Sequence, residues 1–194
     1  MGDLRVFFHL LMRELEERRK ADSRPFVAAF NNPSQAVKTR WMVGAPDHEG
    51  VVKATIRALL SPKELLDGKD WSFRTPRDII AFEGKWKSGE QVALVIAEVE
   101  NVIGEFKGTV SDLVSYQAPL KVAVFYQDSL TPEKLQTRET EIRGVLSYQF
   151  GKGFREARDT EYLIVFGPAT VSEEGIGAWR GIWFTSDWQK SAFL

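Results

Sequence analysis

The sequence contains no cysteine and only two histidines, His9 and His48. The absence of cysteine excludes disulfide bonds, a thiolate nucleophile and a cysteine-ligated zinc site. Two histidines are too few for a histidine-rich metal site. Any metal site in this chain must therefore consist mainly of carboxylates, which are the ligands of hard cations.

The sequence also lacks a long apolar run and a strong net charge. No segment approaches the roughly 18 apolar residues of a membrane-spanning helix. The short apolar stretch 6–12 is followed by charged residues without a small-residue cleavage site, which argues against a signal peptide. We therefore expect a cytoplasmic protein with no membrane partner. The net charge of −1 provides no global basic field for nucleic acid, although it is compatible with a local basic cleft.

What the sequence does contain is typical of one globular domain. The chain has 194 residues, of which 43% are hydrophobic and 27% charged. No repeat or linker divides it, so we expect a single domain over residues 1–194. Apolar residues recur at helical spacing near the start and predict an amphipathic helix over residues 3–22: Leu4, Phe7, Phe8, Leu11, Met12 and Leu15.

Strand and helix patterns alternate through the rest of the chain. Two closely joined strands predict an antiparallel hairpin, and strands separated by helices predict parallel neighbours. The expected fold class is therefore α/β, with a mixed sheet of an antiparallel hairpin plus parallel strands, flanked by helices. The predicted helices are 49–60, 61–68, 107–117 and 131–150, and the predicted strands are 79–86, 91–100, 121–126, 161–166 and 179–185.

The most informative segment is residues 92–100, in which an apolar run ends in Glu98-Val99-Glu100. Side chains alternate along a strand, so Glu98 and Glu100 should point to one side and Val99 to the other. Two carboxylates at the end of a buried strand repel each other and resist desolvation. A divalent cation bound between them relieves both effects.

A third carboxylate, Asp78, directly precedes the first strand of the predicted hairpin. If Lys87 faces Glu90 across the turn, Asp78 lies opposite Val99, and a shift of one residue places it opposite Glu98 or Glu100. Three carboxylates at one strand end can hold Mg²⁺ or Mn²⁺. A metal in such a site can activate water and stabilise charge on a phosphate, with a further general base to take the proton from the attacking water.

Pro76-Arg77-Asp78, the hairpin, Glu98-Val99-Glu100, the following helix and the strand 121–126 together resemble the PD-(D/E)XK nuclease superfamily. The resemblance covers about residues 75–170, with helix 3–22 as the leading helix. It implies a restriction-endonuclease-like fold, a catalytic site of Asp78, Glu98 and Glu100, and Mg²⁺ or Mn²⁺ held by Asp78 and Glu98. It also implies DNA as partner, and a homodimer because duplex cleavage needs two sites.

The sequence departs from the family pattern at one position, because Glu100 stands where the family usually has a lysine that orients or activates water. Some restriction enzymes of the superfamily work with glutamate there. Lys107 could supply a displaced positive charge, and Glu14 could be the additional acid that some members carry in the first helix.

Each of these residues also has a purely structural interpretation. Glu98 and Glu100 could form a solvated strand end paired with Lys85 or Arg77, and Glu14 and Lys107 could be ordinary surface charges. His48 could be an extra ligand or a loop histidine. Three tryptophans could stack bases or close the core, and the spacing favours the core: Trp179, Trp183 and Trp188.

The catalytic and the structural interpretations of these residues lead to three candidate functions. The first is a metal-dependent DNA nuclease built on the three carboxylates. The second is a nuclease-like domain without catalysis that binds nucleic acid or protein. The third is an unrelated α/β domain whose acidic residues are structural.

Overall fold

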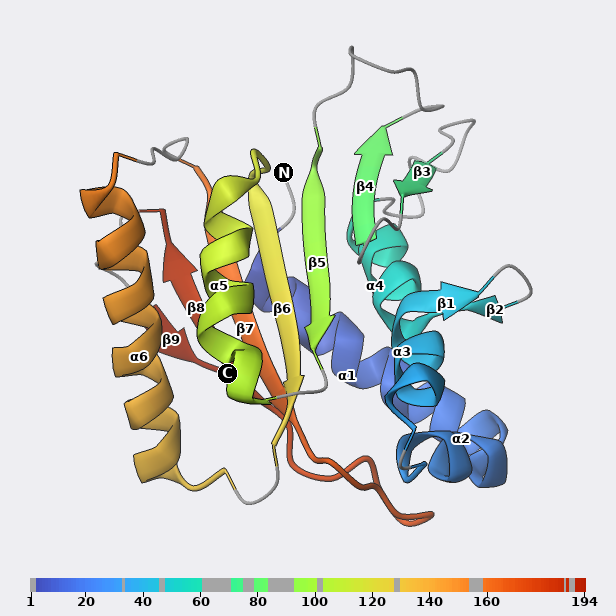
Figure 1. The fold of residues 1–194 in the computed structure, drawn as a ribbon. Helices are drawn as coiled ribbons and strands as arrows, with labels where there is room; N and C mark the ends of the chain where they lie inside the picture. Colours follow the sequence, from blue (N-terminus) through green and yellow to red (C-terminus); the bar gives the residue numbers. More distant parts are fainter. Residues whose placement is uncertain are drawn as a thin grey trace.

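The chain forms a mixed sheet with helices on both faces (Figure 1). The structure is a computed structural model that describes residues 3–32, 34–45, 48–60, 71–74, 79–83, 93–100, 103–127, 130–153, 159–186, 188 and 191–194. The helices are α1 (Leu4–Ala21), α2 (Ser23–Phe30), α3 (Gln35–Val43), α4 (Val51–Leu60), the 3₁₀ helix η2 (Ile103–Glu105), α5 (Phe106–Ser115) and α6 (Pro132–Gly151).

The main sheet has seven strands, which neighbour one another in chain order from β3 to β9. They are β3 (Trp71–Arg74), β4 (Ile79–Glu83), β5 (Val95–Glu100), β6 (Leu120–Tyr126), β7 (Glu161–Gly167), β8 (Arg180–Thr185) and β9 (Ser191–Phe193). A separate two-stranded sheet pairs β1 (Gly44–Ala45) with β2 (His48–Glu49). The three central strands β5, β6 and β7 are parallel, whereas the outer strands pair in antiparallel fashion.

The expected mixed α/β architecture is confirmed, including the antiparallel hairpin and the parallel neighbours. In the hairpin, Ile79 pairs with Ala97 and Ala81 with Val95. This register differs by one residue from the one that a turn with Lys87 facing Glu90 would impose. The turn itself, 84–92, lies outside the described residues, as does the predicted helix 61–68.

Two apolar layers hold the sheet between the helices. The four N-terminal helices cover one face with residues such as Phe7, Phe30 and Ile56. α5 and α6 cover the other face with residues such as Phe106 and Leu146. In Figure 1, α1 crosses behind the sheet while α5 and α6 lie in front of it. Side chains of β5 alternate between these two layers, as the sequence pattern predicts.

Local signals explain the ends of the long helices. The carboxylate of Asp3 accepts a hydrogen bond from the Arg5 amide at 2.7 Å and caps α1. At α6, the hydroxyl of Thr131 accepts from the Lys134 amide at 3.4 Å, and Pro132 occupies the first helical position. Both helices begin within a residue of their predicted starts.

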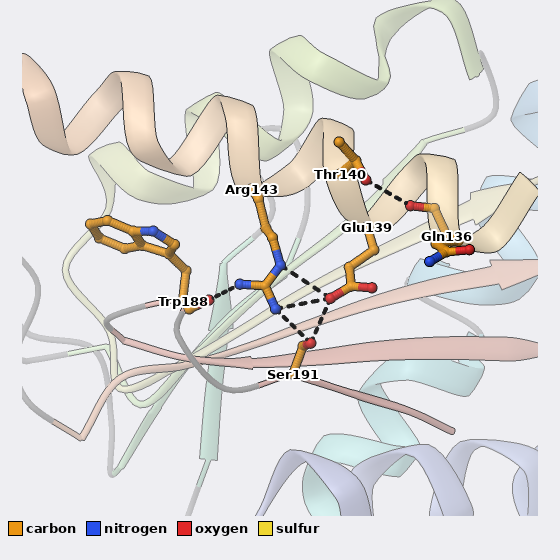
Figure 2. A network of polar contacts seen from close by, with 6 residues as sticks. All are labelled: Gln136, Glu139, Thr140, Arg143, Trp188 and Ser191. Carbon is orange, nitrogen blue, oxygen red and sulfur yellow. Dashed lines mark hydrogen bonds and ion pairs between the residues drawn. The ribbon is translucent and has the colours of Figure 1, made fainter.

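The middle of α6 is attached to the last strand through a polar network (Figure 2). Arg143 forms an ion pair with Glu139 at 2.9 Å and donates to Ser191 Oγ at 2.7 Å and to the Trp188 carbonyl. Ser191 Oγ in turn donates to Glu139 at 2.6 Å. The network therefore joins β9, an edge strand of only three residues, to the helical layer.

Within the ranges given above, no helix has both the length and the apolar character needed to cross a lipid bilayer.

Candidate functional site

Glu98 and Glu100 lie at the carboxyl end of β5 and point to the same side of the sheet. Both are half-buried, whereas Val99 between them is only 7% exposed and packs in the layer on the opposite face. The alternation follows from strand geometry, since successive side chains of a strand point in opposite directions. The two carboxylates therefore face α5 rather than α1.

A cavity of about 430 Å³ opens between the end of β5 and α5. Its lining includes Glu98 and Glu100 from β5 and Glu105 and Asp112 from η2 and α5. Gly108 also borders it, and a Cβ added there would meet nothing within 4 Å. Four carboxylates thus surround one polar hollow, and their like charges create a negative potential that attracts cations.

The helix positions two of these acids by its periodicity. Glu105, Thr109 and Asp112 stand four and then three residues apart, which places them on one face of the turn that leads into α5. Thr109 Oγ1 donates to the Glu105 carbonyl at 3.4 Å, which tethers this first turn. Sequence analysis did not single out Glu105 or Asp112. Asp112 lies within the predicted helix 107–117, whereas Glu105 precedes it and belongs to η2.

The carboxylates of the cavity are the right type of ligand for a hard cation, but too few of the described ones lie close together to hold it. Carboxylate oxygens are the preferred ligands of Mg²⁺ and Mn²⁺. However, among the described residues no group of three acidic or histidine side chains is gathered closely enough to hold a metal ion. The predicted third ligand, Asp78, lies outside the described residues. Its neighbour in the sequence, Ile79, pairs with Ala97, which directly precedes Glu98.

The two auxiliary residues suggested by the sequence do not join this cavity. Glu14 lies on α1, whose buried side chains pack against the opposite face, and it forms an ion pair with Arg18 at 2.6 Å. Lys107 is 66% exposed, and its Nζ pairs with Glu141 of α6 at 3.6 Å. Neither residue is part of the cavity lining. Both side chains form ion pairs on helix surfaces.

The three C-terminal tryptophans pack in or against the core, as their spacing favours. Trp179 is 4% exposed and its Nε1 donates to the Ile176 carbonyl at 2.9 Å. Trp183 packs against the same layer. Trp188 stacks on Phe150 with ring centroids 4.4 Å apart. His48 belongs to β2.

A buried lysine within β6 is a feature that sequence analysis missed, because 121–126 has the pattern of an apolar strand. Lys121 is fully buried, and its Nζ donates to the Tyr162 hydroxyl at 3.4 Å and lies 5.1 Å from the centre of that ring. The residue pairs with Ile96 in the sheet, whereas Phe125 pairs with Glu100. Lys121 is therefore four residues along β6 from the level of Glu100.

In comparisons with known proteins, no protein-family model matches the chain, and no curated protein matches it.

Proposed function

We propose that this protein hydrolyses phosphodiester bonds of DNA with the help of Mg²⁺ or Mn²⁺, through Asp78, Glu98 and Glu100. The observation that carries the proposal is the shared orientation of Glu98 and Glu100 into one polar cavity at the end of a buried strand. The start of β4 supports it further, because Ile79 follows Asp78 in the sequence and pairs next to Glu98.

The three carboxylates have two roles in this proposal. Asp78 and Glu98 hold the cation through carboxylate oxygens. When bound, such a cation lowers the pKa of water and offsets negative charge on the phosphoryl oxygens. Glu100 replaces the usual lysine of the PD-(D/E)XK pattern, and its carboxylate accepts the proton of the attacking water as a general base.

An alternative proposal is a nuclease-like domain without catalysis that binds nucleic acid or protein. It is favoured by the absence of three converging metal ligands among the described residues and by glutamate in place of the family's lysine. The two proposals differ in a measurable way, because only the first requires turnover that depends on the carboxylates.

The test is cleavage of supercoiled plasmid and of single-stranded DNA with Mn²⁺. We expect cleavage by the wild type and a loss of at least roughly 100-fold in Asp78→Ala, the scale on which loss of a metal or an acid–base group acts. Asp112→Asn is the matched control, because it removes one negative charge from the same cavity without removing a proposed ligand. It should retain most of the activity.

Two results would contradict catalysis. One is no cleavage by the wild type at high protein concentration, and the other is equal cleavage by the wild type and Asp78→Ala. Either result would favour the non-catalytic alternative.

For duplex DNA we propose that two chains act together, since one chain carries a single Glu98–Glu100 pair and a duplex has two strands. Linear plasmid appearing without accumulated nicked circles supports this arrangement. Nicked circles that precede the linear product would show that single chains act independently.

A further inference from the structure

A second hollow, between α5 and α6, is next to the acidic cavity. It is a groove of about 500 Å³ with a mainly apolar lining that includes Val145 and Tyr148 of α6. Two glycines, Gly108 and Gly144, also line it from the two helices, and a Cβ added to either would meet nothing within 4 Å. The groove is therefore open because both helices carry glycine at this point. Its volume is within the ~300–1,000 Å³ range of ligand pockets.

Tyr148 is the main exposed aromatic surface of this groove. The residue is 62% exposed, although tyrosine usually buries much of its ring. The Nζ of Lys152 lies 5.3 Å from the centre of the ring. An exposed aromatic ring beside a lysine combines a stacking surface with a positive charge, which is the arrangement that binds single-stranded nucleic acid.

The charges around the groove favour an anionic ligand. Among the described residues of the lining, the one carboxylate is Glu141, which forms ion pairs with Lys107 at 3.6 Å and with Arg138 at 2.6 Å. Its negative charge is thereby offset, and Lys107 and Lys152 contribute positive charge along the same surface. Lysines that follow an apolar groove can neutralise phosphates while bases occupy the groove.

Gly108 borders both the acidic cavity and this groove. The two hollows therefore meet across α5, and no side chain projects from the helix at that point. A polymer that places one phosphate beside Glu98 and Glu100 can continue over Gly108 into the groove.

We infer that the α5–α6 groove holds single-stranded DNA, with a base stacked on Tyr148 and phosphates beside Lys107 and Lys152. The inference rests on the proposed nuclease function, which supplies the reason for a strand to pass from the acidic cavity into the groove. It predicts that the groove prefers single strands to duplex, because bases of a duplex are already stacked on one another and cannot also cover Tyr148.

The test measures, by fluorescence anisotropy, the binding of a fluorescent oligodeoxythymidine to the full chain in EDTA. Tyr148→Ala should weaken binding about tenfold, since stacking on one aromatic side chain contributes on that scale. Tyr148→Phe should bind like the wild type because it keeps the ring. Gly144→Leu should also weaken binding, because its side chain fills the groove.

Gly151→Leu is the matched control for the glycine variant. Gly151 also lies in α6 with nothing within 4 Å of an added Cβ, but it does not line the groove. Leucine favours the helix more than glycine at both positions, so both variants should fold. Thermal melting of each variant verifies this before binding is measured.

Unchanged binding by both Tyr148→Ala and Gly144→Leu would overturn the inference, as would equal affinity of the wild type for single-stranded and duplex DNA, or no binding by the wild type. The measurement uses no metal and no turnover, so it is independent of catalysis. If binding depends on Tyr148 but the protein does not cleave DNA, the inference about the groove stands and the proposed nuclease activity is refuted. If the protein cleaves DNA but binding does not depend on Tyr148, the nuclease activity stands and the inference about the groove is refuted.

Discussion

At the scale of single residues, the buried hydroxyl of Tyr126 is expected to destabilise the core. It lies at the end of β6, fully enclosed, with no hydrogen-bond partner among the described residues. An unpaired buried hydroxyl destabilises a fold because it loses its hydrogen bonds to water. We expect Tyr126→Phe to leave the free energy of unfolding unchanged or to raise it by ~1–2 kcal/mol in urea denaturation at neutral pH.

The same burial predicts how stability changes at alkaline pH. Burial raises the pKa of Tyr126 well above that of an unfolded tyrosine. The unfolded state therefore releases its proton first, and the stability present below about pH 10 is lost as the pH rises further. Tyr126→Phe should lessen this alkaline loss relative to the wild type.

Tyr162→Phe is the matched control, because the Tyr162 hydroxyl accepts a hydrogen bond from the buried Lys121. Removing this partner should lower the free energy of unfolding by ~1–3 kcal/mol, the usual cost of taking a hydrogen bond from a buried polar group. Equal effects of the two substitutions would contradict the interpretation of Tyr126.

At the scale of elements, Arg143 is the centre of the polar network that joins β9 to α6. Arg143 contacts Glu139, Ser191 and the Trp188 carbonyl through its planar guanidinium (Figure 2). Lysine keeps the charge but cannot donate in these directions together. We expect Arg143→Lys to lower the free energy of unfolding by ~1–2 kcal/mol.

The readout specific to the strand is hydrogen exchange at the amides of Gly181 and Leu194, which bond to each other's carbonyl oxygens at the open edge. Arg143→Lys should accelerate exchange at both amides more than in α1. Ser191→Ala removes only the contacts of one hydroxyl and should have a smaller effect. Exchange that increases equally throughout the protein would show that the network stabilises the whole fold rather than this strand.

Elements with a complete local signal could be predicted from the sequence, and short or interrupted ones could not. α6 has a capping threonine, a proline at its first position and a long polar pattern. α2 has Pro25 within its eight residues, and a proline is a common signal for a break, although it is tolerated in the first turn of a helix. β3 and β9 are too short to show a periodic pattern. They form because each pairs with the neighbouring strand of the sheet, β4 or β8.

At the scale of the whole molecule, the candidate site combines a predictable part with one that depends on the tertiary fold. The common orientation of Glu98 and Glu100 follows from strand alternation alone. Glu105 and Asp112 join them only because α5 folds back over β5, which no local pattern specifies. The hairpin register shows the same limit, since one residue more or less in a turn shifts every pairing in the strands it joins.

At the scale of the whole molecule, charge also predicts that a cation should strengthen the proposed binding of DNA. The net charge is −1, and four carboxylates surround the cavity where we propose that a phosphate is cleaved. Without metal these acids repel the phosphate. We therefore expect the double variant Glu98→Gln, Glu100→Gln to bind single-stranded DNA about fivefold more tightly than the wild type in EDTA at low salt.

Addition of Mg²⁺ should reverse this order. Wild-type binding should strengthen as the cation neutralises Glu98 and Glu100, whereas the double variant has no such charges to neutralise and should respond little. High salt should reduce the difference measured in EDTA, because ions screen exposed charges. If Mg²⁺ strengthened binding equally in both proteins, the cation would act on the DNA or elsewhere on the chain, and the carboxylate pair would not be its site.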